Sequence, residues 1–219
     1  MIRRISVLLL LGSLWAGQAQ ASAAADSELS IDYSRFYSHI RKLSGEDTQA
    51  LQFAFGFVHV QSGQLCHISN ARVTTPKQTM PVPISAEQRF TLPSEKALQL
   101  ADAVVELSLA EPPNQCDMSV QLETKAAYLK QAYSSEELSV LVEQYRAFFN
   151  EMGSFLSFMM PSVKGLTLQF ADDNLTMPLK HGLMIQGGML QLPTTWISQQ
   201  KSLSLPAAPV RITAIASRD

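Results

Sequence analysis

The chain has 219 residues, of which 46% are hydrophobic and 16% are charged, and its formal net charge is −2 at pH 7. This apolar content is enough for the core of one or two domains. The weak acidity is spread along the chain, which excludes the basic stripe by which proteins bind nucleic acid and the basic cluster that attaches them to anionic lipid.

Residues 1–21 have the three parts of a secretory signal peptide. Arg3 and Arg4 form a basic start, Ile5 to Ala16 is an apolar core too short to cross a bilayer, and Ala19-Gln20-Ala21 is an A-x-A cleavage site. We therefore expect a periplasmic protein that begins at Ser22. Loss of the two arginines leaves 15 Lys and Arg against 19 Asp and Glu. No later run reaches about 18 apolar residues, so no membrane span is expected after cleavage.

Residues 22–29 are rich in Ala and Ser and are expected to form a flexible tail. They precede an N-terminal unit, residues 30–133, that combines a helix with several strands. The helix is predicted by apolar residues at helical spacing, with Gly45 as its stop. These residues are Tyr33, Phe36, Tyr37, Ile40 and Leu43.

The clearest strand of the chain runs from Leu51 to Val60. Large apolar residues alternate with small apolar ones, which predicts burial of both faces. Residues 61–64 form a turn around Gly63, and Leu65 to Thr75 is predicted as the returning strand of a hairpin.

Three prolines, Pro76, Pro81 and Pro83, indicate a sheet edge or an extended loop, because proline cannot donate to a strand ladder. The rest of this unit is expected to contain short strands at 89–92, 103–109 and 118–122, and helical turns at 94–100. Residues 124–133 fit either a helix or a loop.

The one long helix predicted for the chain spans Ser134 to Met160 and divides the two β-rich parts. Its apolar residues recur every three or four positions, Ser134 and Glu137 match a capping box, and Pro161 ends it. The end of this helix, Phe148-Phe149 and Phe155 to Met160, is the most apolar stretch of the mature chain. Such a run can fill the seam between two sheets, the interpretation preferred here, or line a groove for peptide or lipid.

Residues 134–219 are expected to form a second unit of this long helix and further strands. The strands are predicted at 163–170, 183–185, 189–192, 202–205 and 210–215, with a hairpin around Gly187-Gly188.

Short matches between the halves suggest a degenerate duplication, each half being preceded by a helix. Leu51-Gln52-Phe53 matches Leu168-Gln169-Phe170, and Leu92-Pro93 matches Leu192-Pro193 as the end of a strand. Chance similarity is the alternative, because dipeptide matches recur easily.

Cys66 and Cys116 are the only cysteines, and an even count in an exported chain predicts a disulfide. Two free buried thiols are the alternative. A zinc site is disfavoured, because His67 follows Cys66 directly and points to the opposite face of a strand.

No residue pattern indicates catalysis, a metal site or a cofactor. The histidines, His39, His59, His67 and His181, show no metal-binding spacing, and no nucleophile motif is present. His59 continues the face of the Leu51–Val60 strand, which predicts a histidine at the core or its rim with a satisfied nitrogen. A catalytic site assembled from distant residues stays open.

Some segments resemble a known family. The segments Ser62-Gly63-Gln64-Leu65-Cys66, Gln115-Cys116-Asp117 and Met160 to Leu166 are similar to an uncharacterised family of exported gamma-proteobacterial proteins, a domain of unknown function. The resemblance implies a signal peptide, paired cysteines and nothing catalytic. Separately, Val58 to Thr75 followed by Phe90-Thr91-Leu92 resembles the strand rhythm of transthyretin-like and carboxypeptidase-regulatory-like sandwiches.

We therefore predict an α+β fold of antiparallel sheets or sandwich-like units with the long helix between them. The function predicted is that of a non-catalytic periplasmic protein that binds or supports an unidentified envelope protein or peptide. The alternatives are an envelope hydrolase and a purely structural accessory subunit.

Overall fold

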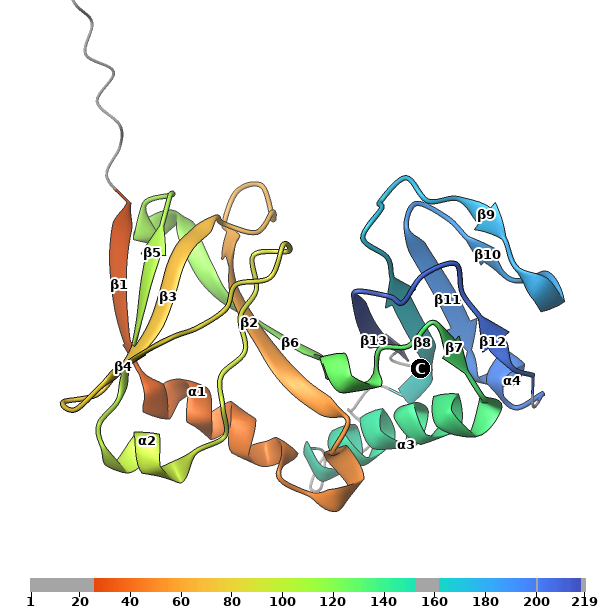
Figure 1. The fold of residues 1–219 in the computed structure, drawn as a ribbon, viewed down its shortest axis with the longest axis horizontal. Helices are drawn as coiled ribbons and strands as arrows, with labels where there is room; N and C mark the ends of the chain where they lie inside the picture. The colour runs from red at the N-terminus through yellow and green to blue at the C-terminus, as the bar shows by residue number, and fades with distance from the viewer. Residues whose placement is uncertain (1–25, 153–161, 200, 218–219) are drawn as a thin grey trace, which may run out of the picture.

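The computed structural model describes residues 26–152, 162–199 and 201–217. Antiparallel sheets and a few helices give the α+β fold that was predicted (Figure 1). The elements gather into two lobes, and helix α3 runs beneath the strands of lobe 2, with its C-terminal end reaching lobe 1. Lobe 1 contains the elements from β1 to β6, and lobe 2 contains those from β7 onward.

Lobe 1 contains a four-stranded antiparallel sheet in the order β1-β5-β3-β4. The strands are β1 (Ser27–Asp32), β5 (Val104–Leu109), β3 (Ile68–Thr74) and β4 (Thr79–Pro81). The predicted flexible tail is wrong from Ser27 onward, because Ser27 to Asp32 pair residue by residue with β5. Leu29 and Ile31 of this strand pack against the core. The prediction missed the strand because its partner, β5, lies far away in the sequence.

A second, two-stranded ladder joins β2 (Leu51–His59) to β6 (Cys116–Thr124). The predicted hairpin begins as expected, since His59 N donates to Gln64 O at 2.8 Å. It then ends early, and β3 leaves to pair with β5. In a longer hairpin, the returning strand would pair with β2 at Phe55. Phe90 pairs there instead, and its backbone exchanges two hydrogen bonds with that of Phe55.

The helices of lobe 1 are short. Helix α1 (Tyr33–Ile40) buries Tyr33, Phe36 and Ile40, and the Phe36 ring meets the Phe55 ring of β2 edge-on. Helix α2 (Lys96–Leu100) packs beside α1. Single 3₁₀ turns occur at Arg41–Leu43, Glu46–Thr48, Pro113–Gln115 and Ala126–Tyr128.

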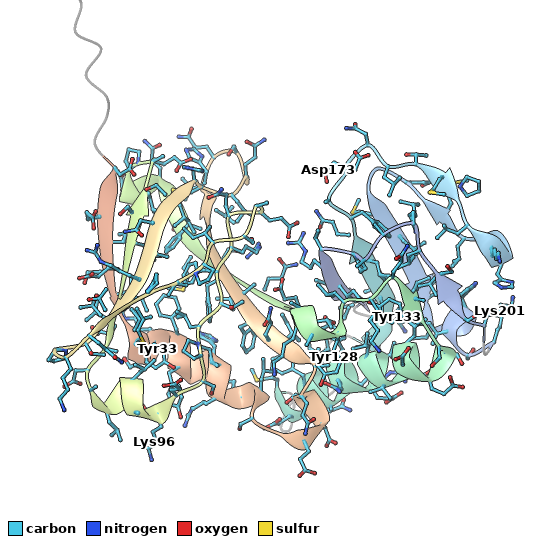
Figure 2. The ribbon with its side chains drawn as sticks, viewed as in Figure 1. Tyr33, Lys96, Tyr128, Tyr133, Asp173 and Lys201 are labelled. Carbon is cyan, nitrogen blue, oxygen red and sulfur yellow. A yellow bond between two sulfur atoms is a disulfide. The ribbon has the colours of Figure 1, made fainter. Side chains whose placement is uncertain are left out.

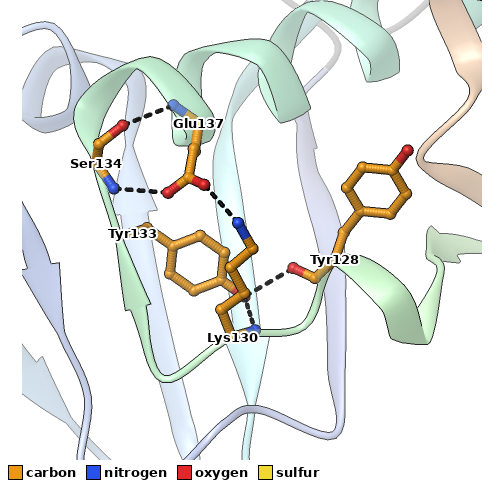
Figure 3. A network of polar contacts seen from close by, with 5 residues as sticks. All are labelled: Tyr128, Lys130, Tyr133, Ser134 and Glu137. Atoms are coloured by element: carbon orange, nitrogen blue, oxygen red, sulfur yellow. Dashed lines mark hydrogen bonds and ion pairs between the residues drawn. The ribbon is translucent and has the colours of Figure 1, made fainter.

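Helix α3 (Ser135–Met152) begins with the predicted capping box. Ser134 N donates to Glu137 Oε2 at 2.9 Å, and Glu137 N donates to Ser134 Oγ at 3.2 Å (Figure 3). Lys130 adds an ion pair to Glu137 at 2.5 Å, and this contact holds the pKa of Glu137 below its usual range. The predicted continuation to Met160 lies outside the described residues.

The sheet of lobe 2 is three-stranded, in the order β11-β8-β13. Its strands are β11 (Met189–Pro193), β8 (Ser162–Gln169) and β13 (Arg211–Ser217). Gly165 is required at the centre, because a Cβ there would lie 2.2 Å from the Leu192 carbonyl oxygen.

Smaller elements complete lobe 2. The pairs are β9 (Met177–Pro178) with β10 (Met184–Ile185), and β7 (Ala132–Tyr133) with β12 (Leu203–Ser204). A 3₁₀ turn lies at Lys180–Gly182 and a one-turn helix, α4, at Thr194–Ile197. The hairpin predicted around Gly187-Gly188 is reduced to one bridge between Gln186 and Met189, because β10 pairs with β9 and β11 with β8.

The proposed duplication receives uneven support from these positions. Leu51-Gln52-Phe53 begins strand β2, whereas Leu168-Gln169 ends strand β8 and Phe170 follows it. Leu192-Pro193 ends strand β11, whereas Leu92-Pro93 lies in irregular structure. The strand predicted at 89–92 is therefore wrong, apart from the isolated bridges that Phe90 forms. The duplication stays a prediction.

One continuous core spans both lobes, and α3 contributes to it from below. Tyr145 of α3 is fully buried, donates its hydroxyl proton to Ile212 O of β13 at 2.7 Å, and lies 3.1 Å from Thr124 Oγ1 of β6. The core interpretation of the helix is confirmed for its buried stripe, which consists of Leu138, Leu141, Val142, Tyr145 and Phe148. Met152 is exposed, and the apolar run beyond it lies outside the described residues. Among these residues, no helix is long and apolar enough to cross a membrane.

We predict that Phe148→Ala lowers the free energy of unfolding by roughly 3–5 kcal/mol, because Phe148 is buried and its ring meets Phe53 edge-on. Chemical denaturation followed by circular dichroism measures this loss. Val140→Ala is the matched control on the exposed side of the same helix, where the side chain is 54% exposed, and should lose less than about 1 kcal/mol. Equal losses at the two positions would contradict the core role of Phe148.

Candidate functional site

A cleft lies where the two lobes meet, and we call it the interlobe cleft. It consists of two adjoining hollows of about 260 and 350 Å³ that share Ser85, Glu87 and Val210 as walls. Lobe 1 contributes its β2–β6 ladder and the segment 83–91, and lobe 2 contributes the residues that precede β13 and follow β8. Asp173, at the side of lobe 2 that faces lobe 1, marks one end of the cleft (Figure 2).

The floor of the cleft is the polar face of the β2–β6 ladder. Gln52, Ala54 and Gly56 of β2 lie opposite Glu123, Gln121 and Ser119 of β6. The other face of the same ladder carries Phe53, Phe55 and Phe57, which belong to the core. Because side chains alternate between the faces of a strand, burial of the phenylalanines fixes the polar residues toward the cleft.

Arg89 crosses this floor. A Cβ atom on Gly56 would lie 3.5 Å from Arg89 Cγ and 3.0 Å from Gln88 O, so the glycine leaves room for the arginine to pass over β2. The path begins at Gln88, whose φ of 56° is unusual for a residue other than glycine. Its side-chain oxygen accepts a hydrogen bond from Ile68 N at 2.7 Å, which fixes the turn.

The guanidinium of Arg89 is poorly satisfied. Its Nη2 lies 3.5 Å from Ser119 Oγ, a long contact, while Nε and Nη1 are buried and have no hydrogen-bond partner within the described part of the chain. Burial lowers the pKa of Arg89, and the positive charge of Arg211 lowers it further. A buried donor without an acceptor destabilises a fold by about 1–3 kcal/mol, so such a group requires an explanation.

Arg211 of β13 lies beside the cleft, is the second cation near Arg89 and has several partners. Its guanidinium lies 3.2 Å from Glu87 Oε1 and donates to Gln121 Oε1 at 3.2 Å. It also donates to Gln169 Oε1. Arg211 therefore connects lobe 2 to two parts of lobe 1, the segment that contains Glu87 and strand β6.

Glu123 of β6 is the carboxylate that the β2–β6 ladder contributes to the cleft. Burial raises its pKa, while the hydrogen bond from Gln52 Nε2 at 2.9 Å and the charge of Arg211 oppose this shift. Burial thus allows Glu123 to take up a proton at a higher pH than an exposed glutamate does. The surroundings of Arg89 combine a second arginine, Arg211, with two acids, Glu87 and Glu123, and burial raises the pKa of Glu123. A third acid, Asp173, lies in the adjoining hollow.

None of the four histidines is among the described residues that line this cleft. His59 has both ring nitrogens engaged, with Gln115 Oε1 at 3.2 Å and with the backbone N–H groups of Gln61 and Ser62 at 3.3 Å. This matches the predicted rim histidine. His39 packs against the Phe53 ring, and His67 and His181 are exposed.

Cys66 and Cys116 are joined, with their Cα atoms 6.4 Å apart. Glu111 lies close enough to complete a possible metal-ligand triad with them. Its carboxylate instead accepts the backbone N–H of His67 at 2.9 Å, and bonded sulfurs are not thiolate ligands.

The proline-marked stretch forms the edge strand β4, which within the described residues pairs only with β3. Gln78 O accepts from Thr75 N, and Val82 N donates to Ala71 O, so the even-numbered residues between them face β3. The outward positions are then Thr79 and Pro81. Because Pro81 has no N–H, this edge offers a partner strand only one donor, and it is a protected edge.

A family model described as a protein of unknown function (DUF2987) matches residues 25–170. The chain belongs to this family. The matched region contains Arg89, Glu87 and Glu123, while Arg211 lies beyond it. Neither the curated proteins nor the solved structures contain a match to the chain.

The sequence interpretation did not select Arg89, Glu123, Arg211 or Glu87. Two signals point toward them after the fact. Gly56 inside an apolar strand indicates close approach of another segment, and Glu123 and Gln121 alternate with apolar residues in the following strand. Neither signal says which distant side chain fills the space.

We predict that Arg89→Met raises the free energy of unfolding by roughly 1–3 kcal/mol, because it removes a buried cation with unsatisfied donors. Denaturant titration measures the change. The control Arg72→Met removes an arginine that pairs with Glu106 on the open face of β3, and it should change stability by less than about 1 kcal/mol. Destabilisation by Arg89→Met would show that the residue is structural.

We also predict that the Cys66–Cys116 bond stabilises the fold by roughly 4 kcal/mol, because it closes a loop of 50 residues in the unfolded chain. Cys66→Ala/Cys116→Ala should lower the free energy of unfolding by about this amount. Thiol titration of the denatured, unreduced protein should detect no free thiol, and two titratable thiols would contradict the bond.

Proposed function

We propose that this protein is an exported, periplasmic protein without catalytic function that binds a protein or peptide of the cell envelope in the interlobe cleft. Export rests on the signal-like residues 1–21 and on the two cysteines, which suit an oxidising compartment. The binding role rests on the site itself.

The observation that carries the proposal is Arg89, a half-buried arginine that lines the cleft with two unsatisfied donors. A fold keeps such a group at the expense of stability, which is typical of functional sites. The cleft also lies between two lobes, a common place for binding sites in proteins.

The composition of the cleft favours binding over hydrolysis. A hydrolase of the predicted alternative kind needs a histidine held beside a carboxylate or a serine. The two hollows are lined by Ser85, Glu87 and Glu123, and no histidine lines either of them. The cleft therefore supplies charged and amide groups for recognition, without the base that would activate a serine.

Site-specific photocrosslinking in intact cells tests this proposal. A benzoylphenylalanine at Ala86, in the wall of the cleft, should yield a crosslinked adduct of defined mass in the periplasmic fraction. The same residue at Ser38, on the exposed side of α1, is the matched control and should yield none.

Two outcomes would contradict the proposal. The first is a full-length chain retained in the cytoplasm, which would remove the export argument. The second is turnover of an ester, amide or glycoside substrate by the purified protein that disappears on Glu123→Gln. That result would establish the hydrolase alternative.

A further inference from the structure

We propose that the interlobe cleft binds a single carboxylate group of its partner, and that Arg89 is the residue that receives it. This inference deepens the proposed function and rests on it for the location of the site. It names the chemistry of the group that enters the cleft.

Arg89 makes fewer hydrogen bonds than its guanidinium has donors. A guanidinium has five N–H donors in a planar fork that matches the two oxygens of a carboxylate. Here only Nη2 has an acceptor, Ser119 Oγ at 3.5 Å, and Nε and Nη1 have none within the described residues. An oxyanion beside the guanidinium supplies the missing acceptors.

Arg211 is the other cation near this site. It already contacts Glu87, Gln121 and Gln169, so it has little capacity for a ligand. Glu87 forms its ion pair with Arg211, while its charge still acts on Arg89 and partly offsets the lowering of that group's pKa by burial. The donors that remain available to a ligand are therefore those of the Arg89 guanidinium.

The balance of charge limits which anion can bind. Arg89 and Arg211 are opposed by Glu87 and Glu123, and Glu123 is also faced by Gln52 of β2 and by the buried hydroxyl of Tyr145 on α3. When Glu123 is protonated, these two arginines and two glutamates together carry one uncompensated positive charge; Asp173, the third acid of the cleft, lines only the adjoining hollow and not the hollow that contains Arg89. One monoanionic carboxylate neutralises the uncompensated charge, whereas a phosphate dianion exceeds it and is repelled by Glu87.

The pH dependence of binding follows from this balance. Above its pKa, Glu123 is ionised and repels an incoming carboxylate. Below its pKa, it is neutral and can donate a hydrogen bond to the ligand. Binding should therefore strengthen as the pH falls from neutral through the raised pKa of Glu123, until the ligand carboxylate itself becomes protonated.

The test is a titration of the purified protein, followed by the ¹H–¹⁵N resonance of Arg89 Nε. The probes are acetate, the peptide acetyl-Ala-Glu-Ala-amide, its neutral counterpart acetyl-Ala-Gln-Ala-amide, and inorganic phosphate. Acetate and the Glu peptide should shift the Arg89 resonance saturably, and the Gln peptide should not. Tighter binding of the Glu peptide than of acetate identifies a peptide carboxylate as the ligand, and the reverse order identifies a free small acid.

Variants separate the role of Arg89 from general electrostatics. Arg89→Gln should weaken binding of the Glu peptide roughly tenfold or more, because a charge-assisted bidentate contact is lost. Arg72→Gln, an exposed arginine paired with Glu106, should leave binding unchanged. Glu123→Gln keeps the size and shape of the side chain, and it should bind more tightly at pH 7 and lose the part of the pH dependence that Glu123 causes.

Three results would overturn the inference: no saturable shift with either carboxylate probe, phosphate binding more tightly than both, or loss of stability in Glu123→Gln. The last would show that Glu123 itself is the ion partner of Arg89. These outcomes are independent of the crosslinking experiment. An adduct without carboxylate binding rejects only this inference, and carboxylate binding without an adduct rejects only the envelope partner.

Discussion

The arrangement of the two lobes depends on the hydroxyl group of Tyr145. It bonds to Ile212 O in lobe 2 and lies beside Thr124 Oγ1 in lobe 1, and all three residues are buried. Because solvent cannot replace either contact, the hydroxyl fixes the end of β6 against the start of β13. Burial also raises the pKa of Tyr145, which keeps this bridging group protonated. The same helix holds the start of β2 through Gln144, whose side-chain oxygen accepts the Ala50 N–H at 2.6 Å.

The interlobe cleft is a consequence of that junction. Once β6 and β13 are joined at Thr124 and Ile212, Arg211 lies within reach of Gln121 and Glu87 across the gap. The β2–β6 ladder then has two distinct environments, a phenylalanine face in the core and a polar face in the cleft. Arg89 enters over Gly56 onto the polar face, where its donors remain largely unpaired. The stability of the core thus supports one locally unfavourable group, as is usual at binding sites.

Several elements were predictable because their signals are local. The capping box at Ser134 and Glu137, the turn at Gly63 with φ of 70°, and most strand segments depend on residues close in the sequence. Strand pairing was less predictable. The segment after Gly63 was assigned to a hairpin with β2, yet Phe90 pairs with Phe55 instead and β3 joins another sheet. Competition between partners separated by tens of residues leaves no periodic signal in either strand.

The sequence by itself determined the α+β class, the long amphipathic helix and the pairing available to two cysteines, since each follows from composition or short-range spacing. Only the tertiary structure decided that residues 27–32 form a strand, that Pro81 protects the β4 edge, and that Arg89, Glu123 and Arg211 meet in one cleft. The physical reason is that a side chain's environment depends on which distant surfaces approach it. Arginine, glutamate and glutamine are ordinary on exposed surfaces, and they become a candidate site here because burial removes the water that would otherwise satisfy them.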